Sequence, residues 1–532
     1  MPSFAKALAI AAAIGVGAVV VFAGALNVFI GTRLFRHLIS YDPGSLLLDY
    51  DRAYSLWPGR IHVEGLVIRG RDRNVEWSLE LDRCDFREHF VGLFRHEFHA
   101  GPVTCDGLSL RLRQRKPAWT ASEVAATPPV PGFPDPALSE PGPPPPPLTD
   151  ANYNLWSVRL DDVVAHHVRE IWVDTMRVAG DADVRGRWYF RPIRRLEVGP
   201  ATIDAHPLDV GDGTAAQLVS EVRGLLHVTV DGVDLRDAPL AAIVDQTSIA
   251  GDITAKAHTR NILRAFSPGT RFEASDAPVT ASVRVDHGVA RPGSEVTAGP
   301  FHAQADSGKL SIKSTLHAHA VVDAADRVRA DITARDLLAT LGARSMRGNM
   351  NLAIHAHREG AWTNVSGSGL SFIGYVGAAQ TSAPGATAPD WWANAELSHA
   401  LYDTTGGLHL RADVAVQAKD ASPLVEAIAS DTPLPLWLLD AASTRRFETR
   451  GQILASPAAL EARDVDAHAQ GVDARFAYLR RSPQTDWALY LDLGALSAGI
   501  ASHDGKAAVM LLDARSWFDA RAATIRASGV HE

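Results

Sequence analysis

Histidines and carboxylates are the residues of this chain best suited to hold a metal ion or to move a proton. Histidines stand close together at three places, His166-His167, His317 with His319, and His355 with His357. A zinc site needs further protein ligands and supporting hydrogen bonds around them. The sequence offers no third ligand in a recognisable spacing, so we expect no metal and no cofactor.

The carboxylate pairs Asp161-Asp162 and Asp464 with Asp466 could serve as an acid and a base. Carboxylates are also common in the turns at strand ends, which is the simpler interpretation. The sequence contains no glycine-rich phosphate loop, no HExxH, no GxSxG and no CxxC. We therefore expect no catalytic residues, and an enzyme with an unrecognised site is only the third hypothesis.

The net charge and the two cysteines limit which partners and which covalent links this protein can have. The net charge of -9 is small for 532 residues, whereas a nucleic-acid-binding protein would show a basic face. We expect no nucleic acid as a partner. The two cysteines, Cys84 and Cys105, lie almost symmetrically about a segment at residues 87–97 that could be a short helix or a broad turn. In an antiparallel pair of strands they could form a disulfide, and the alternative is two buried free thiols.

Strands are the elements that must position all these residues. From Val75 to Asp82, and again from Leu108 to Arg113, apolar residues alternate with polar ones. Side chains of a strand point to opposite faces with a period of two, so each run presents one apolar face and one face in water. Polar residues such as Glu76 and Ser78 are expected in water. Similar runs recur almost to the C-terminus, which predicts a long antiparallel sheet. The apolar positions expected to form a lipid-binding face are Val75, Trp77, Leu79, Leu81, Leu108, Leu110, Leu112, Val283, Val285, Leu310, Ile312, Leu316, Leu352, Ile354, Leu408, Leu410, Leu489 and Leu491.

Two kinds of segment interrupt the strands. Short helices are expected at Ala238–Asp245, Ile262–Phe266, Asp336–Leu341, Pro423–Ala429 and Ser516–Ala522. Residues 117–150 are rich in proline and contain the run PGPPPPP. Such a segment cannot join a strand ladder, so we expect an extended, polar and semi-rigid linker or loop.

The N-terminus carries an apolar run at residues 7–31, broken only by Asn27. About 25 residues at roughly 1.5 Å each would give a helix of roughly 37 Å, enough to cross a bilayer core. The alternative is a cleaved signal peptide, because Lys6 precedes the run and Ala23-Gly24-Ala25 looks like a cleavage site. Apolar residues continue past Ala25, so we favour an uncleaved anchor.

Two segments resemble a known family. The first is AYSLWPGRIHVEGLVI at Ala53–Ile68, followed by an amphipathic strand, a turn and CDGLSLRL at Cys105–Leu112. The second runs from Leu408 to Phe518 and ends in LLDARSWF. Together they resemble the bacterial AsmA-like proteins of the TamB and YhdP type, which share a repeating β-groove with bridge-like lipid transfer proteins. The resemblance implies a single-pass inner-membrane protein with its body in the periplasm, and it carries no catalytic residues.

These observations predict a mostly β fold. We expect a transmembrane anchor at residues 1–36, an N-terminal β module at 37–116, the proline-rich linker at 117–150, and an elongated, curled antiparallel sheet with short helices at 151–532. The apolar interior of such a groove would bind the acyl chains of membrane lipids in lipid transport or outer-membrane homeostasis. The alternative is an anchored, non-enzymatic β-sandwich scaffold that binds another envelope protein.

Overall fold

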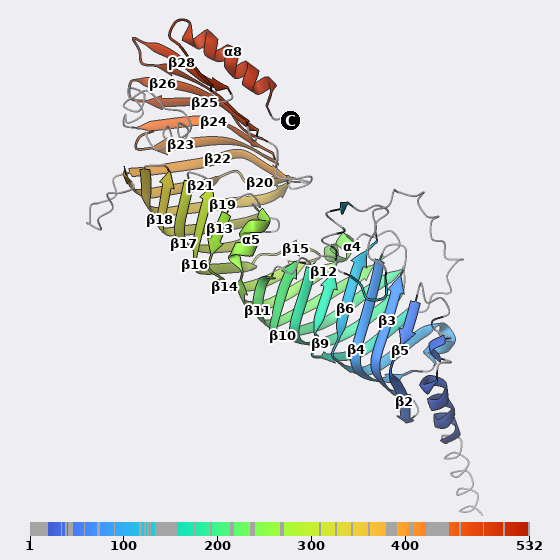
Figure 1. The fold of residues 1–532 in the computed structure, drawn as a ribbon. Coiled ribbons are helices and arrows are strands. Elements are labelled where there is room, and N and C mark those ends of the chain that lie inside the picture. Colours follow the sequence, from blue (N-terminus) through green and yellow to red (C-terminus); the bar gives the residue numbers. More distant parts are fainter. Residues whose placement is uncertain are drawn as a thin grey trace, which may run out of the picture. The chain divides into compact units, whose positions relative to one another are not determined.

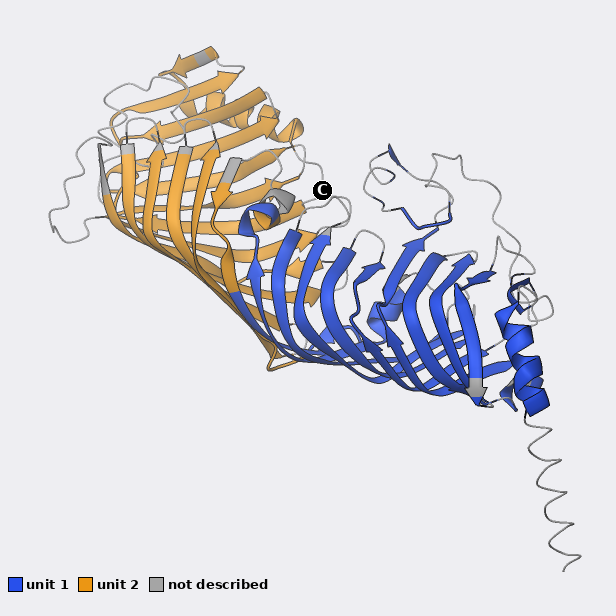
Figure 2. Cartoon of the chain, turned by 60° about the horizontal axis from the view of Figure 1, so that its bottom comes forward, with its two compact units in different colours: residues 1–261, 279–290 blue, residues 262–278, 291–532 orange. Residues whose placement is uncertain are grey.

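The computed structural model confirms that the chain is mostly β, with few helices (Figure 1). It falls into two compact units (Figure 2), unit 1 within residues 1–261 and 279–290, and unit 2 within residues 262–278 and 291–532. The structure describes residues 20–529 except 33–34, 38–39, 41–45, 58, 72–74, 90, 116–119, 122–123, 125–126, 128, 134–156, 174–175, 192–193, 213–216, 235–239, 267–270, 308–309, 325–326, 342–343, 360–361, 379–390, 404–408, 422–445, 457–458, 482–483 and 504–505.

Unit 1 contains a curled sheet, the N-terminal helix described below and the short helix α4. Its elements are β1 (Leu46–Asp49), β2 (Arg52–Trp57), β3 (Arg60–Arg71), β4 (Val75–Glu88), the 3-10 turn η1 (Gly92–Arg95), β5 (Glu97–Asp106), β6 (Ser109–Gln114), β7 (Ser157–His166), β8 (Glu170–Val173), β9 (Met176–Arg191), β10 (Arg195–Asp212), β11 (Gln217–Val233), α4 (Leu240–Asp245), β12 (Thr247–Ala257), most of β14 (Ala277–Asp286) and β15 (Val289–Ala290).

The pairing in unit 1 is antiparallel with two exceptions. β4 pairs with both β5 and β6, and β9 pairs with both β7 and β8. In the same sheet, β5 also pairs with β7 and β6 with β8, and both of these pairs are parallel. Parallel neighbours need a long connection, and the proline-rich segment between β6 and β7 supplies it. The expectation of a purely antiparallel sheet is wrong at this point.

Unit 2 is an antiparallel meander closed by a C-terminal helix. Its elements are most of α5 (Thr259–Phe266), β13 (Arg271–Ala274), β16 (Glu295–Ser307), β17 (Leu310–Ala324), β18 (Arg327–Leu341), β19 (Arg344–Glu359), β20 (Trp362–Asn364), β21 (Ser368–Ala378), β22 (Trp391–Asp403), β23 (His409–Ala418), β24 (Phe447–Ala455), β25 (Leu460–Ala469), β26 (Val472–Arg481), β27 (Gln484–Asp492), β28 (Ser497–His503), β29 (Lys506–Met510) and α8 (Ala514–Ala527). Phe518, Ala522 and Ile525 of α8 pack on one face of β26, β27 and β28.

The strands of both units are curved (Figure 2), and β-bulges interrupt their register. Asp162, Glu221, Asp336, His399 and Asp464 have φ between 47° and 54°, and each stands at a shift in strand register. Aspartate and histidine enter this left-handed region more readily than most residues, and a bulge increases strand twist. The expectation that Asp162 and Asp464 mark strand-end turns is therefore wrong, because both lie inside strands.

Each bulge also exchanges the two faces of the sequence pattern. In β18 the side chains of Ile332 and Ala334 share one face before Asp336, and Leu337 and Ala339 occupy that face after it. The helix expected at Asp336–Leu341 is therefore wrong, since this segment is the second half of β18. The helices expected near residues 238–245, 262–266 and 516–522 are present as α4, α5 and α8. The one expected at Pro423–Ala429 lies outside the described residues.

The N-terminal helix packs against the first strands of unit 1. Residues 20–31 are helical, and the amide of Asn27 donates to the Ser55 carbonyl at 2.6 Å and accepts from the Ser55 N–H at 2.7 Å. The Tyr50 hydroxyl donates to the carbonyl of Ile30, which is buried beside Val63. Among the residues that the structure describes, no helix is long and apolar enough to cross a membrane. Residues 7–19 of the expected anchor lie outside that part of the chain.

Candidate functional site

Continuous rows of apolar side chains cross the strands of unit 1 on one face. Residues that face each other in neighbouring strands point to the same side of a sheet. One row runs through nine strands, from β1 to β12, as Leu48, Ile68, Leu79, Leu110, Ile171, Val178, Val210, Val219 and Ala257. Eight strand spacings of about 4.8 Å give it a length of roughly 38 Å.

Unit 2 repeats the arrangement on its own face. One row contains Phe301, Leu316, Ala334, Met350, Phe372, Ala393, Ala418 and Phe447. A second row, beside it, contains Ala318, Ile332, Leu352, Leu370, Ala395 and Val416. We call these apolar surfaces of the two units the apolar faces.

The apolar faces are incompletely covered. Large side chains of the rows, including Ile68, Leu79, Leu352 and Leu370, are only half-buried. Within each unit the described strands pack mainly on their ladder neighbours, and the additional packing comes from α4, α8, η1 and the N-terminal helix. A sandwich would bury these side chains under a second sheet, and no such sheet occurs among the described residues of either unit.

Most of the residues expected from the sequence lie on these faces. Val75, Trp77, Leu79 and Leu81 share one face of β4, and Leu110 and Leu112 continue it on β6. Leu108 precedes β6 and packs beside Leu81 and Val163. Val283, Val285, Ile312, Leu316, Leu352, Ile354 and Leu410 are half-buried in their strands. Leu489 and Leu491 pack with Trp487 and Ile500, on the face of β27 opposite α8. Leu310 begins β17 but its side chain is not described, and Leu408 lies outside the described residues.

A row of polar side chains lies on the opposite face of unit 2. It contains His317, Thr333, Asn351, Ser371, Asn394, Gln417, Glu448 and His468. The alternation of apolar and polar residues thus extends from single strands across eight strands of the meander, from β17 to β25. His317 is exposed and His319 contacts Glu295, as expected for histidines on a wet face.

The polar face of unit 1 departs from this pattern. Glu76 and Ser78 are buried, which overturns the expectation that they face water. Glu76 forms salt bridges with Arg71 at 2.9 Å and with the buried Arg113 at 2.5 Å. A buried carboxylate is tolerated when such partners surround it.

Part of the proline-rich segment helps to cover this polar face. Val130 is only 2% exposed, and the Pro129 carbonyl accepts a hydrogen bond from Arg111. The expectation of an extended, polar linker or loop is therefore wrong at Val130, whose apolar side chain is buried. Residues 134–150 lie outside the described part of the chain.

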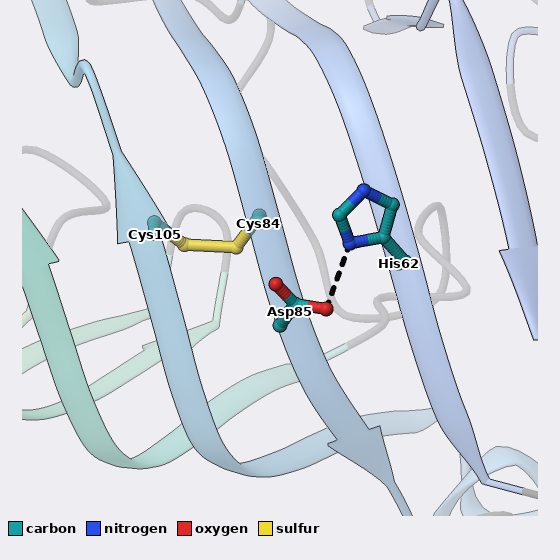
Figure 3. Close-up of a disulfide and its surroundings, with 4 residues drawn as sticks. All are labelled: His62, Cys84, Asp85 and Cys105. Atoms are coloured by element: carbon teal, nitrogen blue, oxygen red, sulfur yellow. Dashed lines mark hydrogen bonds and ion pairs between the residues drawn. A yellow bond between two sulfur atoms is a disulfide. The ribbon is translucent and has the colours of Figure 1, made fainter.

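Cys84 and Cys105 belong to a second row of the apolar face of unit 1. They are opposite each other in β4 and β5, and the structure joins them by a disulfide (Figure 3). Val63 and Ala165 flank them in the same row. His62 and Asp85 contact each other at 2.7 Å on the other side of the sheet.

Glu88 is a residue of the apolar face of unit 1 that the alternation of apolar and polar residues in the sequence did not reveal. It lies two positions beyond Phe86 on the apolar face, opposite the buried Ala100. Neither of its carboxylate oxygens has a hydrogen-bond partner of normal geometry among the described residues. Burial raises the pKa of the Glu88 carboxyl to about 7, and the backbone of His99 offsets only part of this rise.

The groups that could do chemistry are dispersed. His166 contacts Asp183, His167 contacts Asp106, and His357 contacts Glu359. Among the described residues, no three histidine, cysteine or carboxylate side chains gather as a metal would require. Asp161 contacts His99 at 2.8 Å, and hydrogen bonds from His99 and Arg159 lower the pKa of its carboxyl despite partial desolvation.

No family model, curated protein or solved structure matches this chain. The resemblance to AsmA-like proteins therefore stays a prediction from the sequence.

Proposed function

We propose that this protein binds lipid acyl chains on its apolar faces and takes part in phospholipid transport or outer-membrane homeostasis. The observation that carries the proposal is the set of long apolar rows whose large side chains stay partly exposed. Burial of each methylene group contributes about 0.8 kcal/mol, so acyl chains would gain affinity without any catalytic group. The row of unit 1 is longer than one leaflet of hydrocarbon, which is roughly 15 Å thick.

Membrane attachment forms part of the same proposal. The apolar sequence of residues 7–31 supports an inner-membrane anchor. The hydrogen bonds between Asn27 and Ser55 would tie such an anchor directly to the sheet. The family resemblance supports a periplasmic location for the body. The scaffold alternative is less favoured because it requires a second sheet over the apolar faces.

Charge substitutions test the proposal. Ile312→Asp and Ile354→Asp place a carboxylate on the apolar face of unit 2, where both side chains are half-buried. On an open face the carboxylate stays hydrated, so the protein should remain folded and lose co-purified lipid. In a closed core the same change would leave an unpaired buried charge and unfold the protein.

Neighbouring residues on the other face provide matched controls. Ser311→Asp and His355→Asp should change neither thermal melting nor lipid content. Thermal melting and the lipid content of each purified variant are the two measurements. Unfolding of both apolar-face variants, with no lipid in the parent protein, would reject the proposal.

A further inference from the structure

One end of unit 1 exposes large apolar side chains on two adjacent connections. Trp57, at the end of β2, is 66% exposed, and Val91 and Phe94, between β4 and β5, are 70% and 89% exposed. The two connections start side by side, because the N–H of Glu88, the last residue of β4, donates to the Gly59 carbonyl at 2.7 Å. Single exposed apolar residues are common, but several gathered at one edge indicate an interaction surface.

Arginines line the same edge. Trp57 pairs with Arg60 across β2 and β3, and Arg60 pairs with Arg87 across β3 and β4. Both arginines are exposed, as is Arg95 in η1. Like charges directly opposite each other in a sheet are destabilising, and the structure shows no salt bridge to Arg60, Arg87 or Arg95 among the described residues. An anion at this edge would relieve their repulsion.

The N-terminal helix reaches the same edge (Figure 1). Asn27 is hydrogen-bonded to Ser55, two residues before Trp57. The preceding turn carries the exposed side chains of Val20 and Val21. In the sequence, the residues before Val20 are almost all apolar from Ala7 onward. The edge therefore lies where an apolar chain segment meets the sheet.

We propose that Trp57, Val91 and Phe94, with Arg60, Arg87 and Arg95, form a membrane-contact rim that enters the surface of an anionic phospholipid bilayer. The apolar side chains would lie among the upper acyl carbons, and the guanidinium groups would bind the headgroup phosphates. Tryptophan and arginine suit this boundary because each combines an apolar body with a polar end. The inference rests on the proposed membrane location. It adds that the rim itself, and not only residues 7–31, contacts the lipid.

A lipid in the bilayer would then be close to the apolar face of unit 1. Phe86 lies on that face one position before Arg87, and it packs in the apolar cluster with Phe98 and Leu81. Arg87 of the rim and Phe86 of the apolar face are thus neighbours that point to opposite sides at the same end of β4. This geometry gives an acyl chain a short path from the bilayer onto the sheet.

A fluorescent label at the rim tests the inference on the full chain. Both native cysteines form the disulfide, so Phe94→Cys can be labelled alone with an environment-sensitive dye. The protein is placed in phosphatidylethanolamine–phosphatidylglycerol vesicles that contain spin-labelled lipid. The matched control is Leu512→Cys, because Leu512 of unit 2 is a similarly exposed apolar residue at 81%.

We expect the lipid spin label to quench a dye at position 94 at least threefold more than a dye at position 512. The double charge reversal Arg60→Glu with Arg87→Glu should at least halve the quenching at position 94. Equal quenching at the two positions, or no effect of the charge reversal, would overturn the rim. A dye that is shielded at position 94 without lipid quenching would indicate a protein partner and would also overturn it.

The outcome for the rim is separable from the outcome for lipid carriage. Quenching at position 94 in a protein that carries no lipid on its apolar faces would support the rim and reject the proposed transport. Lipid on the apolar faces without quenching at position 94 would do the reverse.

Discussion

Glu88 is a buried acid in an apolar neighbourhood, and its protonation state should affect the stability of unit 1. Its pKa in the folded protein is about 7, above the value of 4.5 for a free glutamate side chain. The protonated form is therefore favoured by folding. The stabilisation that protonated Glu88 gives to the folded state is fully present below pH 4.5 and is lost as the pH rises through 7.

Glu88→Gln should remove this pH dependence, because glutamine keeps the shape and cannot ionise. Each pKa unit corresponds to about 1.4 kcal/mol. The variant should therefore exceed the parent protein in unfolding free energy by about 2 kcal/mol more at pH 8 than at pH 5. Calorimetry of the full chain at the two pH values measures the difference. Glu396→Gln, on the exposed side of β22, is the control and should show none. An equal effect of Glu88→Gln at both pH values would contradict the account.

At the scale of elements, the bulges decide which side chains reach the apolar faces. Asp336 has φ of 52° in the middle of β18. Glycine adopts this conformation without strain, whereas a β-branched residue is a genuine outlier there.

Asp336→Val should therefore lower the unfolding free energy of unit 2 by about 1–3 kcal/mol. Asp336→Gly should be close to neutral. Urea unfolding of the full chain compares the two variants. A valine variant as stable as the parent would show that the bulge is not required.

Strand periodicity predicted much of the sheet but not its bulges. The runs around Trp77, Leu110 and Leu352 lie on the apolar faces because their alternation is uninterrupted. Beyond Asp336 the alternation changes phase, and the segment resembled a helix. Burial of Glu76 was equally hidden, because it depends on the salt bridges to Arg71 and Arg113. Such contacts leave no periodic signal in the sequence.

At the scale of the molecule, the two units share one design. Each is a curled sheet with apolar rows on one side, and each leaves that side without a second sheet among its described residues. Side chains of the rows come from up to nine strands. A surface assembled from so many strands suits a long apolar ligand better than a compact one. The central claim is that this ligand is an acyl chain.

Photo-crosslinking to lipid tests that claim most directly. A photoactivatable amino acid is placed in living cells at Leu352 or Val416, on the apolar face of unit 2, and at Asn351 or Gln417, one position away on the polar face. Mass spectrometry of the purified protein then detects lipid adducts. The account predicts phospholipid adducts at Leu352 and Val416 and few or none at Asn351 and Gln417. Absence of lipid at the first pair, or equal labelling of both faces, would contradict it.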